Sequence, residues 1–166
     1  SAWVVTLEAL EPFRVNGPVQ NPSVMPYLSS RGSRNYDINL QVAIQPMNCK
    51  ETIVSHSNFK YMYWNHRQQL AHHTVTGCNM NPGDLLGSGT ISGPTADPPT
   101  YGSMLELAWA GPGHGPGSKT IQLNDGIERK FLKDGDEVFM SGHCQGNGYR
   151  VGFGECRGVV LPAHTN

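Results

Sequence analysis

The chain has 166 residues, enough for one domain with a hydrophobic core and too few for two domains of ordinary size. Charged residues make up 15% of it, below the roughly 25% of a typical soluble domain, and the formal net charge is −1 at pH 7. This low charge provides no electrostatic footprint for nucleic acid or an anionic membrane surface. Many glycines and prolines separate short apolar runs, which favours a mainly β fold.

The cysteines predict the cellular compartment, and the amino terminus predicts a cut within a longer protein. The four cysteines have no Cys-x-x-Cys spacing, so we expect free thiols in a reducing compartment, the cytoplasm, although their number also permits a disulfide framework. No run approaches the roughly 18 apolar residues of a membrane span, and no targeting segment is recognisable. The opening SAWVVTLEAL lacks an initiator Met and reads as strand, so we expect a cut at Ser1 within a longer protein.

The first third of the chain reads as strands around a proline-rich loop. Trp3 to Leu10 suits a strand, and the prolines between residues 11 and 33 indicate a loop. Apolar residues alternate with polar ones from Tyr36 to Ile44, which predicts a half-buried strand. Residues Cys49 to Ser55 extend the predicted sheet.

One central helix is predicted, from about Asn58 to Thr76. Its apolar and aromatic residues follow helical spacing, with Ser57 as the expected N-cap and Gly77 as the stop. A turn at Pro82-Gly83 follows. The aromatic cluster near the helix start, Phe59 to Trp64, predicts core or subunit-interface packing, with ligand stacking as the alternative.

The remainder reads as short strands joined by turns. Hairpin signals stand at Asn124-Asp125-Gly126 and Asp134-Gly135-Asp136, and PGHGPG (112–117) predicts an exposed loop. GNGYRVGFG (146–154) matches no phosphate-binding motif, so a tight hairpin or bulge is expected there. The predicted strands are Leu85–Ile91, Ser103–Trp109, Ile121–Leu123, Lys130–Leu132, Glu137–His143, Arg150–Gly154 and Gly158–Leu161.

The candidate functional residues are Glu106 and a glycine-rich loop. Glu106 lies in the otherwise apolar run YGSMLELAW, near Gly89 and Thr90 of GSGTISG. A carboxylate in apolar surroundings must be paired or functional, because burying an unpaired charge is too costly. The histidines have no His-Glu-x-x-His or comparable spacing, so packing or surface positions are favoured over metal ligands.

Several segments together resemble the fumarylacetoacetase family. They are SNFKYMYWNHRQQLAHHTVTGCNMNPGDLLGSGTISGP, YGSMLELAW, RKFLKDGDEVFMSGHCQGNGYRVGFGEC and GVVLPA, and the earlier SAWVVTLEALEPF and YDINLQV are also similar to it. The resemblance covers essentially the whole chain. It implies a mixed β-sandwich roll, a homodimer, and hydrolysis of the C–C bond of 4-fumarylacetoacetate to fumarate and acetoacetate in tyrosine and phenylalanine catabolism.

The resemblance also implies roles for individual residues. In the family, water attacks a metal-bound substrate with the help of a His–Glu pair. Glu106 matches the glutamate that orients this histidine, and Gly89 and Thr90 match a loop that contacts the substrate. The family's base histidine and its ligands for Mg²⁺ or Ca²⁺ are expected upstream of Ser1. Residues 1–166 are therefore expected to form a single incomplete domain that is inactive alone and binds no metal by itself.

Two alternatives to this reading remain open. The chain could be a non-catalytic dimerisation or scaffold module of the same fold. It could also belong to a related hydrolase or decarboxylase that acts on another keto acid.

Overall fold

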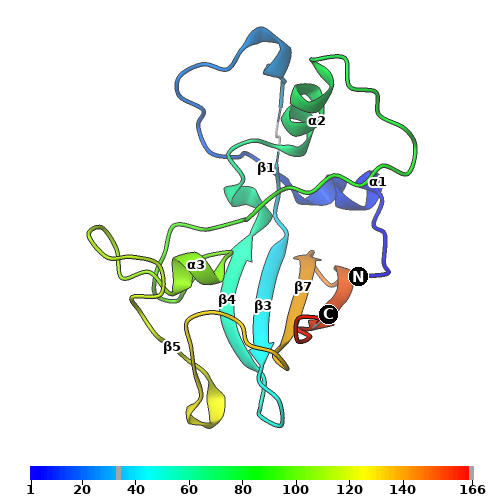
Figure 1. The fold of residues 1–166 in the computed structure, drawn as a ribbon. Coiled ribbons are helices and arrows are strands. Elements are labelled where there is room, and N and C mark those ends of the chain that lie inside the picture. The colour runs from blue at the N-terminus through cyan, green and yellow to red at the C-terminus, as the bar shows by residue number, and fades with distance from the viewer. Residues whose placement is uncertain (33–34, 165–166) are drawn as a thin grey trace.

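The computed structural model describes residues 1–32 and 35–164. Three antiparallel sheets and a few short helices make the described chain mainly β, as predicted (Figure 1). Within those residues the sheets stay open and form no closed barrel. The expected sandwich-roll arrangement remains a prediction. No helix of the described chain combines the length and the apolar character needed to cross a membrane.

The central sheet has the order β4-β3-β7-β8 and contains the long strands. These are β3 (Asn39–Gln45), β4 (Thr52–Asn58), β7 (Glu137–Gln145) and β8 (Arg150–Val159). The two smaller sheets pair β1 (Arg14–Val15) with β2 (Asn35–Tyr36) and β5 (Ile121–Gln122) with β6 (Glu128–Arg129). The helices are α1 (Leu7–Leu10), α2 (His66–Thr74) and α3 (Met104–Leu107), with 3-10 turns at Glu11–Phe13, Pro26–Leu28, Phe59–Tyr61 and Asn124–Gly126.

The sequence predicted most strands of the central sheet. The run from Tyr36 to Ile44 is β2 followed by β3, and the predicted extension from Cys49 is β4. The hairpin or bulge predicted for residues 146–154 is a hairpin whose turn, residues 146–149, joins β7 to β8, with the Gly146 amide donating to the Tyr149 carbonyl at 2.9 Å. The prediction of two strands after Arg150 is wrong, because β8 is continuous. Its register against β7 shifts between Ser141 and His143, and such a bulge breaks the alternation along the strand.

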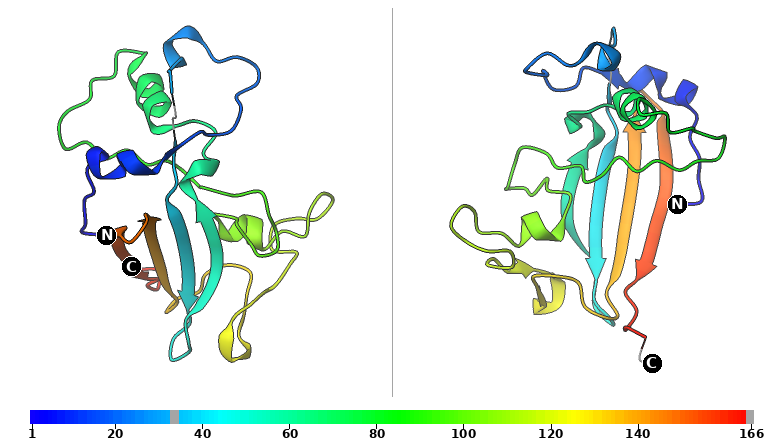
Figure 2. Two further views of the ribbon diagram at one scale, coloured as in Figure 1. Left: turned by 180° about the vertical axis from the view of Figure 1, so that it is seen from behind. Right: turned by 45° about the horizontal axis from the view of Figure 1, so that its top comes forward.

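Two hydrophobic clusters stabilise the sheet at opposite ends of β3. Leu40, Val42 and Ile44 alternate along that strand and so share one of its faces. Leu40 packs against a cluster that contains Leu10 and Phe13, and Val42 packs against one that contains Ile44 and Leu107. The first cluster therefore attaches α1 to the sheet, and the second attaches α3 and the β5–β6 hairpin. In both views of Figure 2 α1 lies at one end of the sheet, whereas α3 and the β5–β6 hairpin lie beside its β4 edge.

The amino-terminal segment is not the strand that the sequence predicted. Residues 7–10 form α1, in which the Thr6 hydroxyl accepts from the Ala9 amide at 3.4 Å, while Trp3 is 73% exposed. The residues before α1 lie against β8 through side-chain contacts and not through a strand ladder. The Ser1 hydroxyl donates to the Phe153 carbonyl and accepts from the Trp3 amide at 3.1 Å.

The central helix is shorter than predicted. It begins at Asn65 and not near Ser57. The Asn65 side chain accepts from the Gln68 amide at 3.1 Å, and the Gln68 side chain accepts from the Asn65 amide at 3.1 Å. This reciprocal capping box begins the helix there. Gly77 follows the last turn with φ +88°, as expected of a stop.

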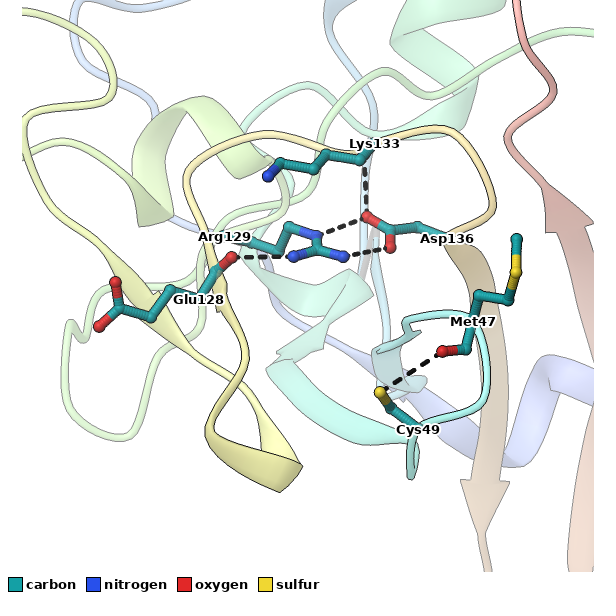
Figure 3. A network of polar contacts seen from close by, with 6 residues as sticks. All are labelled: Met47, Cys49, Glu128, Arg129, Lys133 and Asp136. Atoms are coloured by element: carbon teal, nitrogen blue, oxygen red, sulfur yellow. Dashed lines mark hydrogen bonds and ion pairs between the residues drawn. The ribbon is translucent and has the colours of Figure 1, made fainter.

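A buried ion pair connects the β5–β6 hairpin to the start of β7 (Figure 3). Arg129 Nε and Nη2 donate to the two Asp136 carboxylate oxygens, each at 2.8 Å, and the Lys133 amide donates to Oδ2 at 2.9 Å. Asp136 is 1% exposed. The hydrogen bond with Arg129 lowers the Asp136 pKa and raises the Arg129 pKa. The predicted strand Lys130–Leu132 is wrong, because these residues belong to the loop that brings the pair together.

Candidate functional site

Gly89 and Thr90 lie in a segment with no regular secondary structure. The predicted strand Leu85–Ile91 is wrong: the described chain offers it no partner strand, and Leu85 is 96% exposed. Gly89 has φ +78°, a conformation that favours glycine and interrupts an extended run. In Figure 1 this green segment passes from α2 down toward α3.

Glu106 lies on α3, not on a strand, so the predicted strand Ser103–Trp109 is also wrong. The Ser103 hydroxyl caps α3 by accepting from the Glu106 amide at 3.3 Å. Ser103-Met-Leu-Glu106 has the spacing of a capping box, Ser-x-x-Glu, which is a helix-start signal. That local signal outweighs the apolar run that favoured a strand.

The Glu106 side chain is paired, as a half-buried carboxylate should be. Its Oε2 accepts from the Ser92 hydroxyl at 2.8 Å and from the Ser103 hydroxyl at 2.8 Å. Ser92 Oγ also accepts from the Gly102 amide at 3.0 Å. The carboxylate therefore joins the start of α3 to the segment that contains Thr90.

Close backbone packing keeps these two segments together. A Cβ at Gly102 would lie 2.7 Å from the Ile91 carbonyl oxygen and 2.9 Å from Thr90 Cγ2, too close for any side chain. Gly93 is equally enclosed, since a Cβ there would lie 2.8 Å from both the Thr100 and the Tyr61 side chains. The two glycines allow the loop to lie directly against residues 100–103.

A cavity of about 890 Å³ lies between this loop and α2. It contains both predicted loop residues, Gly89 and Thr90, together with Ser92. Glu106 does not line it and is connected to it through Ser92. The structure thus brings the three predicted residues into one region. Gly89 and Thr90 line the cavity, whereas Glu106 does not line it and contacts a lining residue, Ser92, through a hydrogen bond. The rest of the lining is Tyr27, Leu28, Tyr61, Met62, Tyr63, Trp64, Gln68, Gln69, His72, His73, Leu86, Gly87, Ser88 and Ile91.

Aromatic residues from the predicted cluster form part of the cavity wall. Tyr61, Tyr63 and Trp64 line it, with Tyr63 and Trp64 packed edge to face at 5.1 Å between ring centroids. Trp64 is 44% exposed. Tyr61, Tyr63 and Trp64 are therefore placed where they could stack on a ligand, which was the alternative interpretation of the aromatic cluster. The half-buried Phe59 instead packs against the first hydrophobic cluster, as the packing interpretation expects.

Polar groups on α2 complete the wall. His72 Nδ1 lies 3.0 Å from the Tyr27 hydroxyl, and the two rings are stacked. His73 Nε2 lies 3.4 Å from Cys78 Sγ. Sequence reasoning treated these histidines as packing or surface residues and did not place them at the site. Helical spacing could have indicated their position, because His72 and His73 lie three or four residues after Gln68 and Gln69 and so share a face of α2 with them.

His66, at the start of α2, lies away from the cavity lining. Its ring packs against Tyr36, with 5.5 Å between centroids. Burial lowers the pKa of His66, and the neighbouring Arg67 and Arg14 lower it further. His66 is therefore a packing residue, one of the two positions that the sequence favoured for the histidines.

The residues of the site do not form a metal centre. Across residues 1–32 and 35–164, no group of three or more His, Cys, Asp or Glu side chains could hold a metal ion. The residues present therefore do not fit a Mg²⁺ or Ca²⁺ site.

The expectation that metal ligands lie upstream of Ser1 concerns residues outside this chain, so it stays a prediction. Ser1 itself does not line the cavity, because its hydroxyl is bonded to the Phe153 carbonyl on β8. The Ser1 hydroxyl thus contacts the central sheet, and we assign Ser1 no role in the site.

Comparison with known proteins identifies the family. Residues 1–161 match the family described as fumarylacetoacetate (FAA) hydrolase C-terminal, so the chain belongs to that family. It is 57% identical over 166 residues to a fumarylacetoacetase of Dictyostelium discoideum. It is 53% identical over 164 residues to the Homo sapiens fumarylacetoacetase and 51% identical over 164 residues to that of Arabidopsis thaliana. In each case 98% of this chain is covered, but it spans only 37% of the relative's length.

Proposed function

We propose that the protein containing this chain is a fumarylacetoacetase. It would hydrolyse the C–C bond of 4-fumarylacetoacetate to fumarate and acetoacetate, the last step of tyrosine and phenylalanine catabolism, in the cytoplasm. The family membership and the names of the relatives support this activity. The main structural observation behind the proposed site is the hydrogen bond between the Glu106 carboxylate and Ser92. Ser92 lines the same cavity as Gly89 and Thr90.

The roles of the residues follow from their chemistry. Hydrolysis needs a general base for water, and a neighbouring carboxylate can orient and stabilise an imidazole that serves as this base. Glu106 is suited to this part, because Oε2 is occupied by two serine hydroxyls while Oε1 accepts no hydrogen bond within the described residues. The histidine that it orients would come from outside this chain.

We assign the cavity to a small-molecule substrate. Its wall is formed by aromatic rings and a glycine-rich loop, with a few polar groups from α2, which is the usual make-up of a small-molecule site. A Cβ added at Gly89 would meet nothing within 4 Å, so its backbone is accessible, and Thr90 adds a hydroxyl to the same loop. We assign both to substrate contact.

Metal dependence, if the full-length protein shows it, has to come from ligands outside the described residues, and we place them upstream of Ser1. Two buried or half-buried carboxylates are already paired, Asp136 with Arg129 and Glu106 with two serines, and no group of three or more His, Cys, Asp or Glu side chains in the described residues could hold a metal ion. No step is assigned to Mg²⁺ or Ca²⁺ through these residues. For the same reason we propose that this chain is inactive alone.

We also propose that the protein is a homodimer. Several large apolar side chains are strongly exposed, among them Val19 at 90% and Leu161 at 75%, and a second copy would cover some of them. Sedimentation equilibrium of the full-length protein at micromolar concentration tests this, and a monomeric mass would contradict it.

The function is tested by incubating the full-length protein with 4-fumarylacetoacetate and measuring the release of fumarate and acetoacetate. We expect stoichiometric formation of both products. A scaffold module would release neither. A related keto-acid hydrolase or decarboxylase would instead act on another member of a panel of β-diketo and β-keto acids, and either result would overturn the proposal.

A further inference from the structure

Two serine hydroxyls converge on the same oxygen of Glu106. Ser92 Oγ and Ser103 Oγ each lie 2.8 Å from Oε2. They come from different parts of the chain, Ser92 from the loop that follows Thr90 and Ser103 from the N-cap of α3. A carboxylate held from two segments in this way has little freedom to rotate.

The direction of each hydrogen bond is fixed by a second contact. Ser92 Oγ accepts from the Gly102 amide at 3.0 Å, and Ser103 Oγ accepts from the Glu106 amide at 3.3 Å. Each hydroxyl has one proton, and a backbone amide can only donate. Both serines therefore give their proton to Oε2, which leaves Oε1 as the acceptor available to another group.

We propose that Ser92 and Ser103 are positioning residues for the reaction. They hold the Glu106 carboxylate so that Oε1 accepts the hydrogen bond that orients the base. This inference rests on the proposed function, because it assigns the serines a part in the same site. Neither serine is proposed to contact the reacting atoms.

The two serines differ in what else they touch. Ser92 lines the cavity, so its removal changes the substrate wall as well as Glu106. Ser103 does not line the cavity, so its effect on Glu106 can be measured more cleanly. Ser103 is also an N-cap, and glycine is a tolerated N-cap that lacks a hydroxyl. Ser103→Gly therefore removes the proton donor and largely keeps the cap, and Ser103→Thr keeps both.

The experiment measures kcat and KM for 4-fumarylacetoacetate in the full-length protein. Ser103→Gly should lower kcat about 10- to 100-fold, as expected for a misplaced catalytic group, with KM within about twofold of the wild-type value. Ser103→Thr should retain most of the activity. In a Glu106→Gln background, Ser103→Gly should have little further effect, because the serine acts through that carboxylate. Ser118→Ala is the matched control: its hydroxyl accepts from the Ala110 amide at 2.9 Å and bonds no carboxylate.

Three results would overturn the inference. They are wild-type kcat in Ser103→Gly, a rise in KM with kcat unchanged, or the same loss of kcat with and without Glu106. Should Ser103→Gly fail to fold, judged by its thermal transition, Ser92→Ala is interpreted by the same kcat and Glu106→Gln criteria. An inactive wild-type protein would overturn the proposed function and this inference together, whereas an active one with unaffected serine variants overturns the inference alone.

Discussion

At the scale of single residues, the sequence identified Glu106 but not its partners. An acidic residue inside YGSMLELAW was expected to be paired or functional, and the structure shows it paired, while its function stays a prediction. Ser103 could have been found, because Ser-x-x-Glu is a local pattern. Ser92 could not, since it lies 14 residues away in sequence and reaches Glu106 only through the fold of the loop. Asp136 was interpreted as a turn residue, yet it is buried against Arg129.

We expect the Arg129–Asp136 ion pair to stabilise the folded protein. Asp136→Asn leaves the buried guanidinium without its counter-charge and should lower the free energy of unfolding by about 3 kcal/mol. Urea denaturation of the full-length protein at pH 7 measures this. Asp134→Asn, at an exposed carboxylate in the same turn, is the control and should change stability by less than about 0.5 kcal/mol. Equal stability of the two variants would contradict the assignment.

The same pair makes stability depend on pH. The folded-state pKa of Asp136 is lowered, mainly by the hydrogen bond from Arg129. Its contribution is therefore complete above the unfolded value of about 3.9 and is lost as the pH falls from there through the folded pKa. The wild-type protein should lose more stability than Asp136→Asn over this acidic range. Urea denaturation at stepwise lower pH measures both proteins, and parallel losses would show that the pair is not responsible.

At the scale of elements, period and turn chemistry predicted the central sheet. β3 follows apolar alternation, and β4, β7 and the start of β8 are short runs that lie between recognisable turns. The failures are segments where an apolar run had no partner strand. Residues 85–91 remain irregular, residues 103–109 form α3 behind a serine cap, and residues 7–10 form α1 after Thr6. Which strand pairs with which depends on tertiary contacts, so the order β4-β3-β7-β8 was not predictable.

We expect the capping box of α2 to stabilise the protein. Asn65 is 2% exposed, and its side chain accepts from the Arg67 and Gln68 amides, each at 3.1 Å. Asn65→Ala should destabilise the protein by about 1–2 kcal/mol, because it leaves these amides without an acceptor. Thermal or urea unfolding measures the loss. Asn79→Ala, at an exposed position beyond the helix, is the control, and a loss no larger than in that variant would contradict a capping role.

At the scale of the whole molecule, the chain corresponds to one part of the longer fumarylacetoacetases that it resembles. Its cavity wall, loop and carboxylate are in place, and no group of side chains in the described residues could hold a metal ion. The relatives are longer, with this chain spanning 37% of their length. Family membership was predictable because the resemblance extends over many segments. The cavity was not, because it is formed by α2 and a loop whose relative placement no sequence period encodes.

We propose above that Glu106, beside the Gly89-Thr90 loop, serves the hydrolysis. The most direct test is kcat/KM for 4-fumarylacetoacetate in the full-length Glu106→Gln protein, compared with wild type and with Glu51→Gln at an exposed site. Loss of the orienting charge should lower kcat/KM by about 10²- to 10⁴-fold, the range expected when acid–base catalysis is disabled, while Glu51→Gln stays at the wild-type value. Wild-type turnover in Glu106→Gln would contradict the claim.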